Sequence, residues 1–164
     1  MSNKLGFVFD FEIVGLDGTV RDKFSQENII PDVGRDYMLS SALAGGSAIS
    51  SWYIGLYENV RVPVASDTMV TLLADAGEII DYSGTPRLTL TADPISGGVF
   101  SNSVTKAEFT FTAAKTVRGG FITSNSVKSN TAGTLLSAVQ LPTAKTLAIG
   151  EVLRCTAGLV FYTS

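Results

Sequence analysis

The sequence predicts an all-β fold, an antiparallel β-sandwich resembling a jelly roll, with one short α-helix at about 33–44. Two observations predict this class: apolar and polar residues alternate in many short segments, and Gly, Pro, Asn or Ser bounds each segment. A length of 164 residues suits one domain with its own core. We therefore expect a single domain over 1–164, made of an N-terminal hairpin arm (1–27) and a main body (28–164).

The N-terminal arm is predicted to be a β-hairpin. Residues 5–14 alternate with period two, which is typical of a half-buried strand. The Asp-Gly pair at 17–18 is typical of a two-residue type I′ turn. A turn at this position places Glu12 opposite Lys23, a favourable cross-strand pair.

The apolar side of the first strand needs a cover, because an isolated two-stranded hairpin is only marginally stable in water. Two alternatives remain for what buries this apolar side. Either the domain's own sheets lie over this side, or a second copy or another protein does, and the face then clamps across a subunit boundary. On the second alternative, the candidate protein-interface residues are Phe7, Phe9, Phe11 and Ile13.

The chain contains one convincing helical segment. Pro-Asp at 31–32 opens it, an approximate apolar face runs along it, and the Gly-Gly pair at 45–46 ends it. Ser66 is a candidate cap for a further short helical turn at 67–74. Strands are predicted at 52–57, 87–91, 99–104, 107–112, 117–123, 135–141, 146–149 and 152–162.

The residues needed for catalysis are scarce. The chain has no histidine and one cysteine, which excludes a histidine-based triad, His-ligated zinc and an intrachain disulfide. That cysteine, Cys155, lies in mid-strand and is predicted to be a small buried hydrophobe. No phosphate-binding glycine motif occurs, and the Gly-Gly pair at 119–120 predicts a β-bulge or a close backbone approach. We expect no enzyme, no cofactor and no metal.

Two groups of carboxylates could still carry chemistry. Asp10 and Glu12 lie on one side of a strand, about 7 Å apart by strand rise, which is not an impossible spacing for paired acid–base work. The alternative that we favour is a solvated outer face, with a lysine beside Glu12. Asp75, Glu78 and Asp81 could bind a cation through oxygen ligands, but they lack the alternation of an EF-hand loop.

Trp52, Tyr53 and Tyr57 form a candidate aromatic surface. Aromatic side chains of this kind could stack on sugar rings. The alternation in the segment instead points Trp52 into the core with its aliphatic neighbours, and the tyrosines then lie at the edge of that core.

Charge and hydropathy predict no nucleic-acid or membrane partner. The net charge is −3, and the basic residues are scattered rather than gathered into a stripe. The uncharged stretch 37–57 contains too many Ser and Gly residues for a membrane span, and Asp10 and Glu12 interrupt any signal-peptide core. A chain with 16% charged residues has a surface suited to contact with another protein. With no export signal and no paired cysteines, we expect synthesis and assembly in a reducing cytoplasm.

Five segments carry a resemblance to a known family. They are NIIPDVGRDYMLSSALAGG (28–46), WYIGLYE (52–58), KAEFTFTAAKTVRGGFITS (106–124), GTLLSAVQL (133–141) and IGEVLRCTAGLVF (149–161). In this order they resemble the capsid decoration proteins, also called cement proteins, of tailed bacteriophages. The likeness consists of ordinary core and turn residues, includes no catalytic motif and leaves the first 27 residues uncovered.

The resemblance implies a structural virion protein. Such a protein binds the outer surface of an assembled phage capsid and stabilises joints between major capsid protein subunits. The implied partners are the major capsid protein of a phage head and further copies of this chain, as a dimer or trimer. The implied location is the capsid exterior, after synthesis in the host bacterial cytoplasm. Two alternatives stay open: a phage tail or baseplate component, and a carbohydrate-binding jelly-roll module that uses Trp52 and Tyr57.

Overall fold

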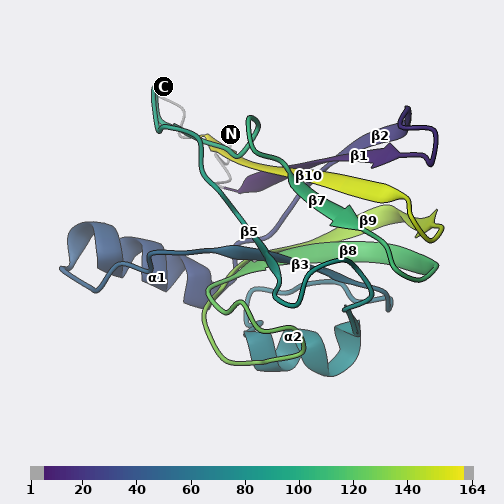
Figure 1. Ribbon diagram of the computed structural model, residues 1–164. Helices are drawn as coiled ribbons and strands as arrows, with labels where there is room; N and C mark the ends of the chain where they lie inside the picture. Colours follow the sequence, from purple (N-terminus) through teal and green to yellow (C-terminus); the bar gives the residue numbers. More distant parts are fainter. Residues whose placement is uncertain (1–5, 161–164) are drawn as a thin grey trace.

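The computed structural model describes residues 6–160 as two antiparallel sheets packed face to face (Figure 1), which confirms the predicted β-sandwich. Sheet A contains β1 (Phe7–Val14), β2 (Val20–Glu27), β6 (Val99–Phe100), β7 (Ala107–Thr110) and β10 (Val152–Val160). Sheet B contains β3 (Tyr53–Tyr57), β4 (Glu78–Ile79), β5 (Leu88–Thr89), β8 (Lys115–Thr123) and β9 (Leu135–Leu147). The described residues also form the helices α1 (Asp32–Leu43) and α2 (Met69–Ala76).

The N-terminal hairpin is an integral part of sheet A. The strand order is β2-β1-β10, and the short strands β6 and β7 both pair with β10. β1 pairs with β10 along its whole length, from Phe7 opposite Leu159 to Val14 opposite Val152. This pairing corrects the predicted division into an arm and a body, because β1 takes its hydrogen-bond partners from both ends of the chain.

The hairpin has the predicted register but a different turn. Glu12 lies opposite Lys23, as predicted. The amide of Gly15 donates to the carbonyl oxygen of Thr19 at 2.8 Å, so the loop contains three residues (16–18) rather than two. A register shift near the turn inserts one extra residue in β2 and restores the predicted pairing further along.

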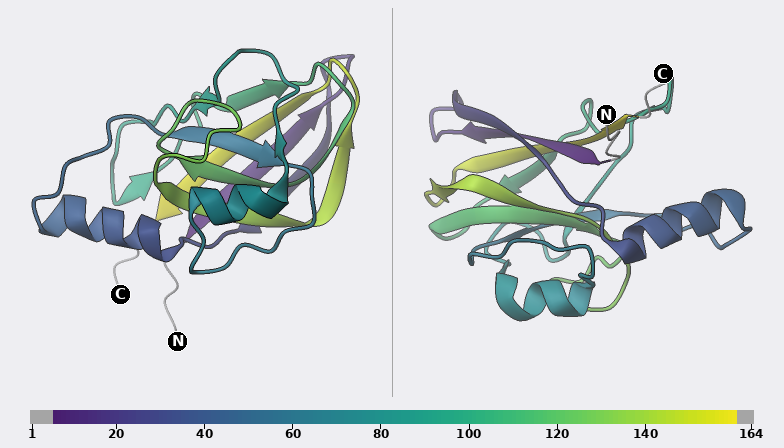
Figure 2. Two further views of the ribbon diagram at one scale, coloured as in Figure 1. Left: turned by 90° about the horizontal axis from the view of Figure 1, so that it is seen from below. Right: turned by 180° about the vertical axis from the view of Figure 1, so that it is seen from behind.

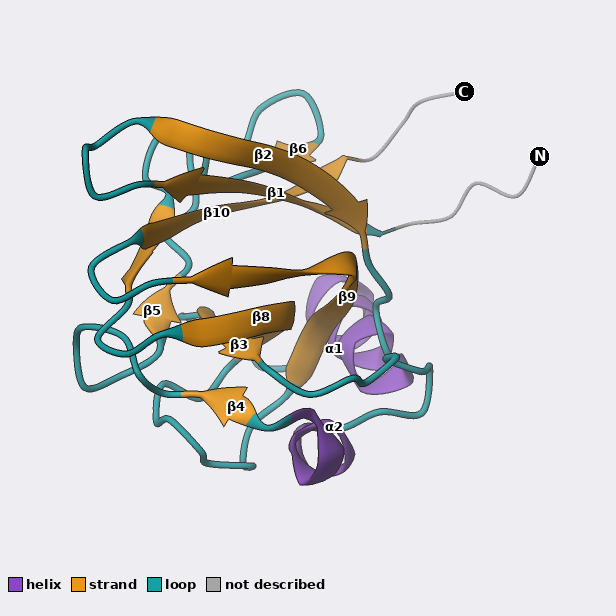
Figure 3. Ribbon diagram, turned by 90° about the vertical axis from the view of Figure 1, so that its right-hand side faces the viewer, coloured by secondary structure: helices purple, strands orange, loops and turns teal. Residues whose placement is uncertain are grey.

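The main core lies between the two sheets, whose stacking is visible in Figure 3. Phe7, Phe9, Phe11 and Ile13 are each at most 2% exposed and pack with apolar residues of sheet B. The domain's own second sheet therefore covers the apolar side of β1, which was the first of the two alternatives. The assignment of these four side chains to an interface with another chain is wrong for the folded domain, because the sandwich uses them as its core.

A second apolar cluster lies on the outer face of sheet B. Tyr57 and Phe121 point outward from β3 and β8, and α2 covers them with Met69, Leu72 and Ala76. Figure 1 shows α2 beneath these strands. The outer face of sheet B is thus apolar and covered where α2 crosses it.

Each of these aromatic rings lies across a glycine of the neighbouring strand. A Cβ at Gly55 would come within 2.2 Å of the Phe121 ring, and one at Gly119 would come within 2.0 Å of the Tyr57 ring. The β8–β9 ladder also shifts its register next to Gly119. The close approach and the bulge predicted for this glycine pair are both confirmed.

α2 begins two residues later than predicted. Its N-cap is Thr68, whose hydroxyl accepts from the amide of Thr71, while the Thr71 hydroxyl accepts from the amide of Thr68. The predicted cap at Ser66 is wrong, because the chain first makes a turn in which Asp67 accepts from the amide of Val64 at 2.8 Å.

α1 spans nearly the predicted range and extends beyond the edge of the sheets (Figure 2). Its first turn lies directly on β9, where a Cβ at Gly34 would meet two backbone carbonyl oxygens at 2.6 and 2.9 Å. Further along, the exposed fractions of Leu39 and Leu43 rise to 58% and 82%. Only the beginning of the helix therefore packs against the sandwich.

In the C-terminal part of the chain, two segments that were predicted as separate strands contribute to one strand. The segment predicted at 135–141 and the first two residues of the one predicted at 146–149 belong to a single strand, β9, whose pairing with β8 is interrupted between them. β4 was not predicted. The predicted end of the last strand, at 161–162, lies outside the described residues.

A bidentate ion pair ties the hairpin to the turn before β10. Arg21 donates from Nε and Nη2 to the two carboxylate oxygens of Glu151 at 2.7 and 2.8 Å. Glu151 also accepts from the amide of Ala148 at 2.8 Å. The Arg21 guanidinium, followed by this amide, holds the pKa of Glu151 below its usual value.

Gly34→Ala is expected to lower the free energy of unfolding by about 1–3 kcal/mol, because the added methyl group meets backbone oxygens that cannot rotate away. This loss outweighs the gain of up to about 1 kcal/mol that alanine brings to a helix interior. Urea unfolding followed by circular dichroism measures the change. The control is Ala42→Gly at an exposed position of α1, which should lose about 1 kcal/mol through propensity alone. A stabilised Gly34→Ala would contradict the packing described here.

Acidification is expected to remove the contribution of Glu151 to stability. Because its folded-state pKa lies below its unfolded value of about 4.3, the ionised carboxylate stabilises the fold above that pH. The contribution is lost as the pH falls through the folded-state pKa. Unfolding free energies measured from pH 6 downward should therefore fall less steeply in Glu151→Gln and in Arg21→Gln than in the wild type. Unchanged slopes in both variants would refute the linkage.

Candidate binding surfaces

Cys155 occupies the structural role that its position predicts. Its side chain is 0% exposed in β10, and burial raises the pKa of the thiol. The thiol is reduced and enclosed by the main core. A nucleophile needs an accessible thiolate, so this residue is not placed to act on a substrate.

Asp10 and Glu12 lie on the solvated outer face of sheet A. Glu12 contacts the Nζ atoms of Lys23 and Lys106, each at 3.0 Å. Lys106, followed by Lys23, holds the pKa of Glu12 below its usual value. Asp10 instead accepts a hydrogen bond from Ser25. Glu12 is thus a poor proton donor at neutral pH, and the two carboxylates do not form an acid–base pair.

The three acidic residues considered as cation ligands have separate partners. Asp81 pairs with Lys115 at 2.9 Å, Asp75 lies 4.0 Å from Arg61, and Glu78 is buried. Between residues 6 and 160, no group of three or more Cys, Asp or Glu side chains is placed to hold a metal ion.

Glu78 belongs to a buried network that shapes the loop after β8. Arg87 donates to both carboxylate oxygens of Glu78 at 2.7 and 2.8 Å, and the two side chains are 0% and 3% exposed. Arg87 also donates to the backbone carbonyl oxygens of Asn125 and Asn130, both at 2.9 Å. The amide of Ser129 donates to Glu78 at 2.7 Å. The pair therefore holds the loop in place, a structural role that the sequence analysis missed.

Trp52, Tyr53 and Tyr57 do not form one aromatic surface. Trp52 packs against the main core and edge-on to Tyr37, with ring centroids 5.2 Å apart. Tyr57 is 0% exposed on the opposite side of β3 and donates from its hydroxyl to the carbonyl oxygen of Val139. The predicted sugar-stacking platform is therefore absent from these three residues, and the prediction that Trp52 points toward the core is confirmed.

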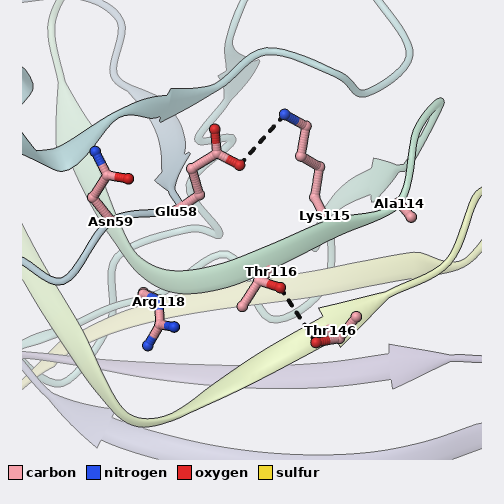
Figure 4. A pocket seen from close by; sticks show the side chains of 7 residues that line it. All are labelled: Glu58, Asn59, Ala114, Lys115, Thr116, Arg118 and Thr146. Carbon is pink, nitrogen blue, oxygen red and sulfur yellow. Dashed lines mark hydrogen bonds and ion pairs between the residues drawn. The ribbon is translucent and has the colours of Figure 1, made fainter.

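A polar groove opens where β3 ends and β8 begins. Its volume is about 410 Å³. Figure 4 shows its lining, formed by Glu58, Asn59, Ala114, Lys115, Thr116, Arg118 and Thr146.

The two cations of this groove differ in their surroundings. Lys115 lies 2.9 Å from Asp81 and 3.4 Å from Glu58, and the Asp81 carboxylate beside it raises the pKa of Lys115. The half-buried Arg118 side chain makes no ion pair and no hydrogen bond with the described residues. The hydroxyls of Thr116 and Thr146 lie 3.3 Å apart across the two strands. The groove thus combines a lysine paired with two carboxylates, a guanidinium without a partner among residues 6–160, and neutral polar groups.

A row of valines lies on the segment between β3 and α2. Val60, Val62 and Val64 are exposed by 69%, 60% and 45%, while Arg61 and Pro63 between them are less exposed. This valine row and the outer half of α1 are two places where large apolar side chains are exposed; Leu16, Ile95, Val104 and Ile149 are exposed elsewhere.

No protein-family description matches the chain, and no curated protein matches it either. Within residues 6–160, no helix has the length and apolar character needed to cross a membrane.

Burial of Cys155 predicts slow alkylation. In the native protein, iodoacetamide should react far more slowly than with a free cysteine, and urea should restore the ordinary rate. Cys155→Ser should lower the free energy of unfolding by roughly 1–3 kcal/mol, because a hydroxyl is buried without an assured partner. Fast labelling without denaturant would contradict the enclosed position.

Proposed function

We propose that the chain is a structural virion protein that binds the outer surface of an assembled phage capsid and stabilises joints between major capsid protein subunits. The observation that carries the proposal is the resemblance of five segments to capsid decoration proteins. Those segments fall in two stretches of the sequence, 28–58 and 106–161, and elements from the two stretches pack together in the fold. They contain β3, β8 and the first part of β9, which are neighbours in sheet B, α1, which packs on β9, and the pair β7–β10. The likeness therefore follows one connected part of the sandwich.

The exposed apolar side chains support a protein partner. Leu43 at the outer end of α1 and Val60 in the valine row are 82% and 69% exposed. Apolar side chains held on a rigid sandwich offer contact area at low ordering cost. A function in protein contact suits these features better than glycan binding, because the aromatic residues proposed for stacking are dispersed.

We also propose that the protein acts in many copies, as a symmetric dimer or trimer on the capsid exterior. A repeated lattice lets modest contacts combine, since binding of one subunit raises the effective concentration of the next. The tail or baseplate alternative requires a small copy number.

Purified virions and emptied heads test the proposal. In virions of the phage that encodes the chain, quantitative mass spectrometry should find hundreds of copies per particle. Added protein should cosediment saturably with undecorated heads and raise their temperature of disruption. Heads of an unrelated phage provide the control and should not bind. A few copies per virion, located on tails, would favour the tail component, and no binding to heads would refute the proposal.

A further inference from the structure

Arg118 differs from the other described cations of the chain. The sequence has 12 Lys and Arg residues, of which Lys4 lies outside the described part. Lys128 donates to three backbone carbonyl oxygens at 2.7–3.0 Å. Carboxylates lie within 4.0 Å of nine others: Arg21, Lys23, Arg35, Arg61, Arg87, Lys106, Lys115, Lys145 and Arg154. Within residues 6–160, Arg118 is left without a partner, and its side chain lines the polar groove.

A break in the β8–β9 ladder places Arg118 in the groove. Val117 pairs with Lys145, whereas Gly119 pairs with Gln140, so Arg118 of β8 and residues 141–144 of β9 lie outside the paired ladder. Bulges commonly redirect a side chain in this way. The backbone of the next residue, Gly119, is fixed in position because the Tyr57 ring lies across it. The backbone therefore directs the Arg118 side chain toward the groove that it lines.

The charges of the side chains in and beside the groove indicate what kind of ion it can bind. Lys115 faces two carboxylates, Glu58 and Asp81, so these three side chains and Arg118 together carry no net charge. Among residues 6–160, the guanidinium of Arg118 is the cation of this group that has no carboxylate of its own, and a ligand with a single negative charge suits it best. Figure 4 shows its guanidinium apart from the Glu58–Lys115 pair. A carboxylate carries one charge and accepts two parallel N–H bonds from a guanidinium. A multiply charged phosphate would add excess negative charge near Glu58.

We propose that this groove binds one carboxylate, the side chain of an Asp or Glu residue on the protein surface that the domain contacts. Arg118 binds it directly, and the hydroxyls of Thr116 and Thr146 and the amide of Asn59 are the neutral polar groups beside it. The identity of the partner rests on the proposed function, whereas the carboxylate specificity rests on the groove alone.

Acetate tests the site without any partner. In an NMR titration at constant ionic strength, acetate should shift the Arg118 Nε–H and the backbone amides of Thr116 and Thr146 saturably, with millimolar affinity. Arg118→Gln should abolish the response and Arg118→Lys should weaken it. Arg154→Gln, which removes a cation paired with Glu108 on sheet A, should leave it unchanged. A non-saturable response, or an equal response to sulfate, would mean an adventitious ion only and would overturn the proposal.

Binding to heads then distinguishes a partner side chain from a free carboxylate. Arg118→Gln should weaken binding at least tenfold, whereas Arg154→Gln should not, with both variants folded by circular dichroism. If the wild type binds heads and Arg118→Gln binds equally well, the partner carboxylate is refuted and the proposed function stands. If the wild type binds no heads, the proposed function and its partner fail together. Saturable acetate binding would in that case still support a carboxylate site.

Discussion

Phe7, Phe9 and Phe11 have to be buried on one side of β1, while Asp10 and Glu12 have to remain in water on the other. A strand inside a sheet that is covered on one face only meets both conditions. β1 therefore lies between β2 and β10 and faces sheet B across the core. This one-sided burial also determines the orientation of β10, whose alternating apolar residues join the same core. The outer face of sheet A is left polar and ion-paired as a consequence.

Sheet B meets the opposite condition, because both of its faces carry apolar residues. Tyr57 and Phe121 lie in the notches provided by Gly119 and Gly55, and α2 shields them from water. The part of sheet B that α2 covers is the part that carries Tyr57 and Phe121. α2 ends at Gly77, whose left-handed backbone (φ 64°) stops the helix. The polar groove that Arg118 lines lies at the end of β3 and the start of β8.

The local sequence patterns predicted the features that depend on interactions between neighbouring residues, namely the strands, the helix and its ends. Alternation identified most strands, and the Pro-Asp and Gly-Gly signals located α1 closely. Contacts between distant segments could not be predicted in this way. The cover over Phe9 depends on sheet B, and the buried Arg87–Glu78 pair depends on the loop carbonyls at Asn125 and Asn130. The sequence shows that Arg118 is basic, but its lack of a partner among residues 6–160 is visible only when the carboxylates of that part of the chain have been placed.

A carboxylate on Arg118 and the exposed apolar residues would contribute differently to one interface. A charge-assisted hydrogen bond contributes roughly 1.5–3 kcal/mol, which is far too little for stable association of a single copy. Burial of side chains such as Leu43 and Val62 supplies affinity but little directional preference, because the hydrophobic effect is non-directional. A bidentate contact with the planar guanidinium of Arg118 instead defines an angle and a register. On a repeated lattice, an orienting contact of this strength is sufficient, because every copy that docks in register adds to the avidity of the whole layer.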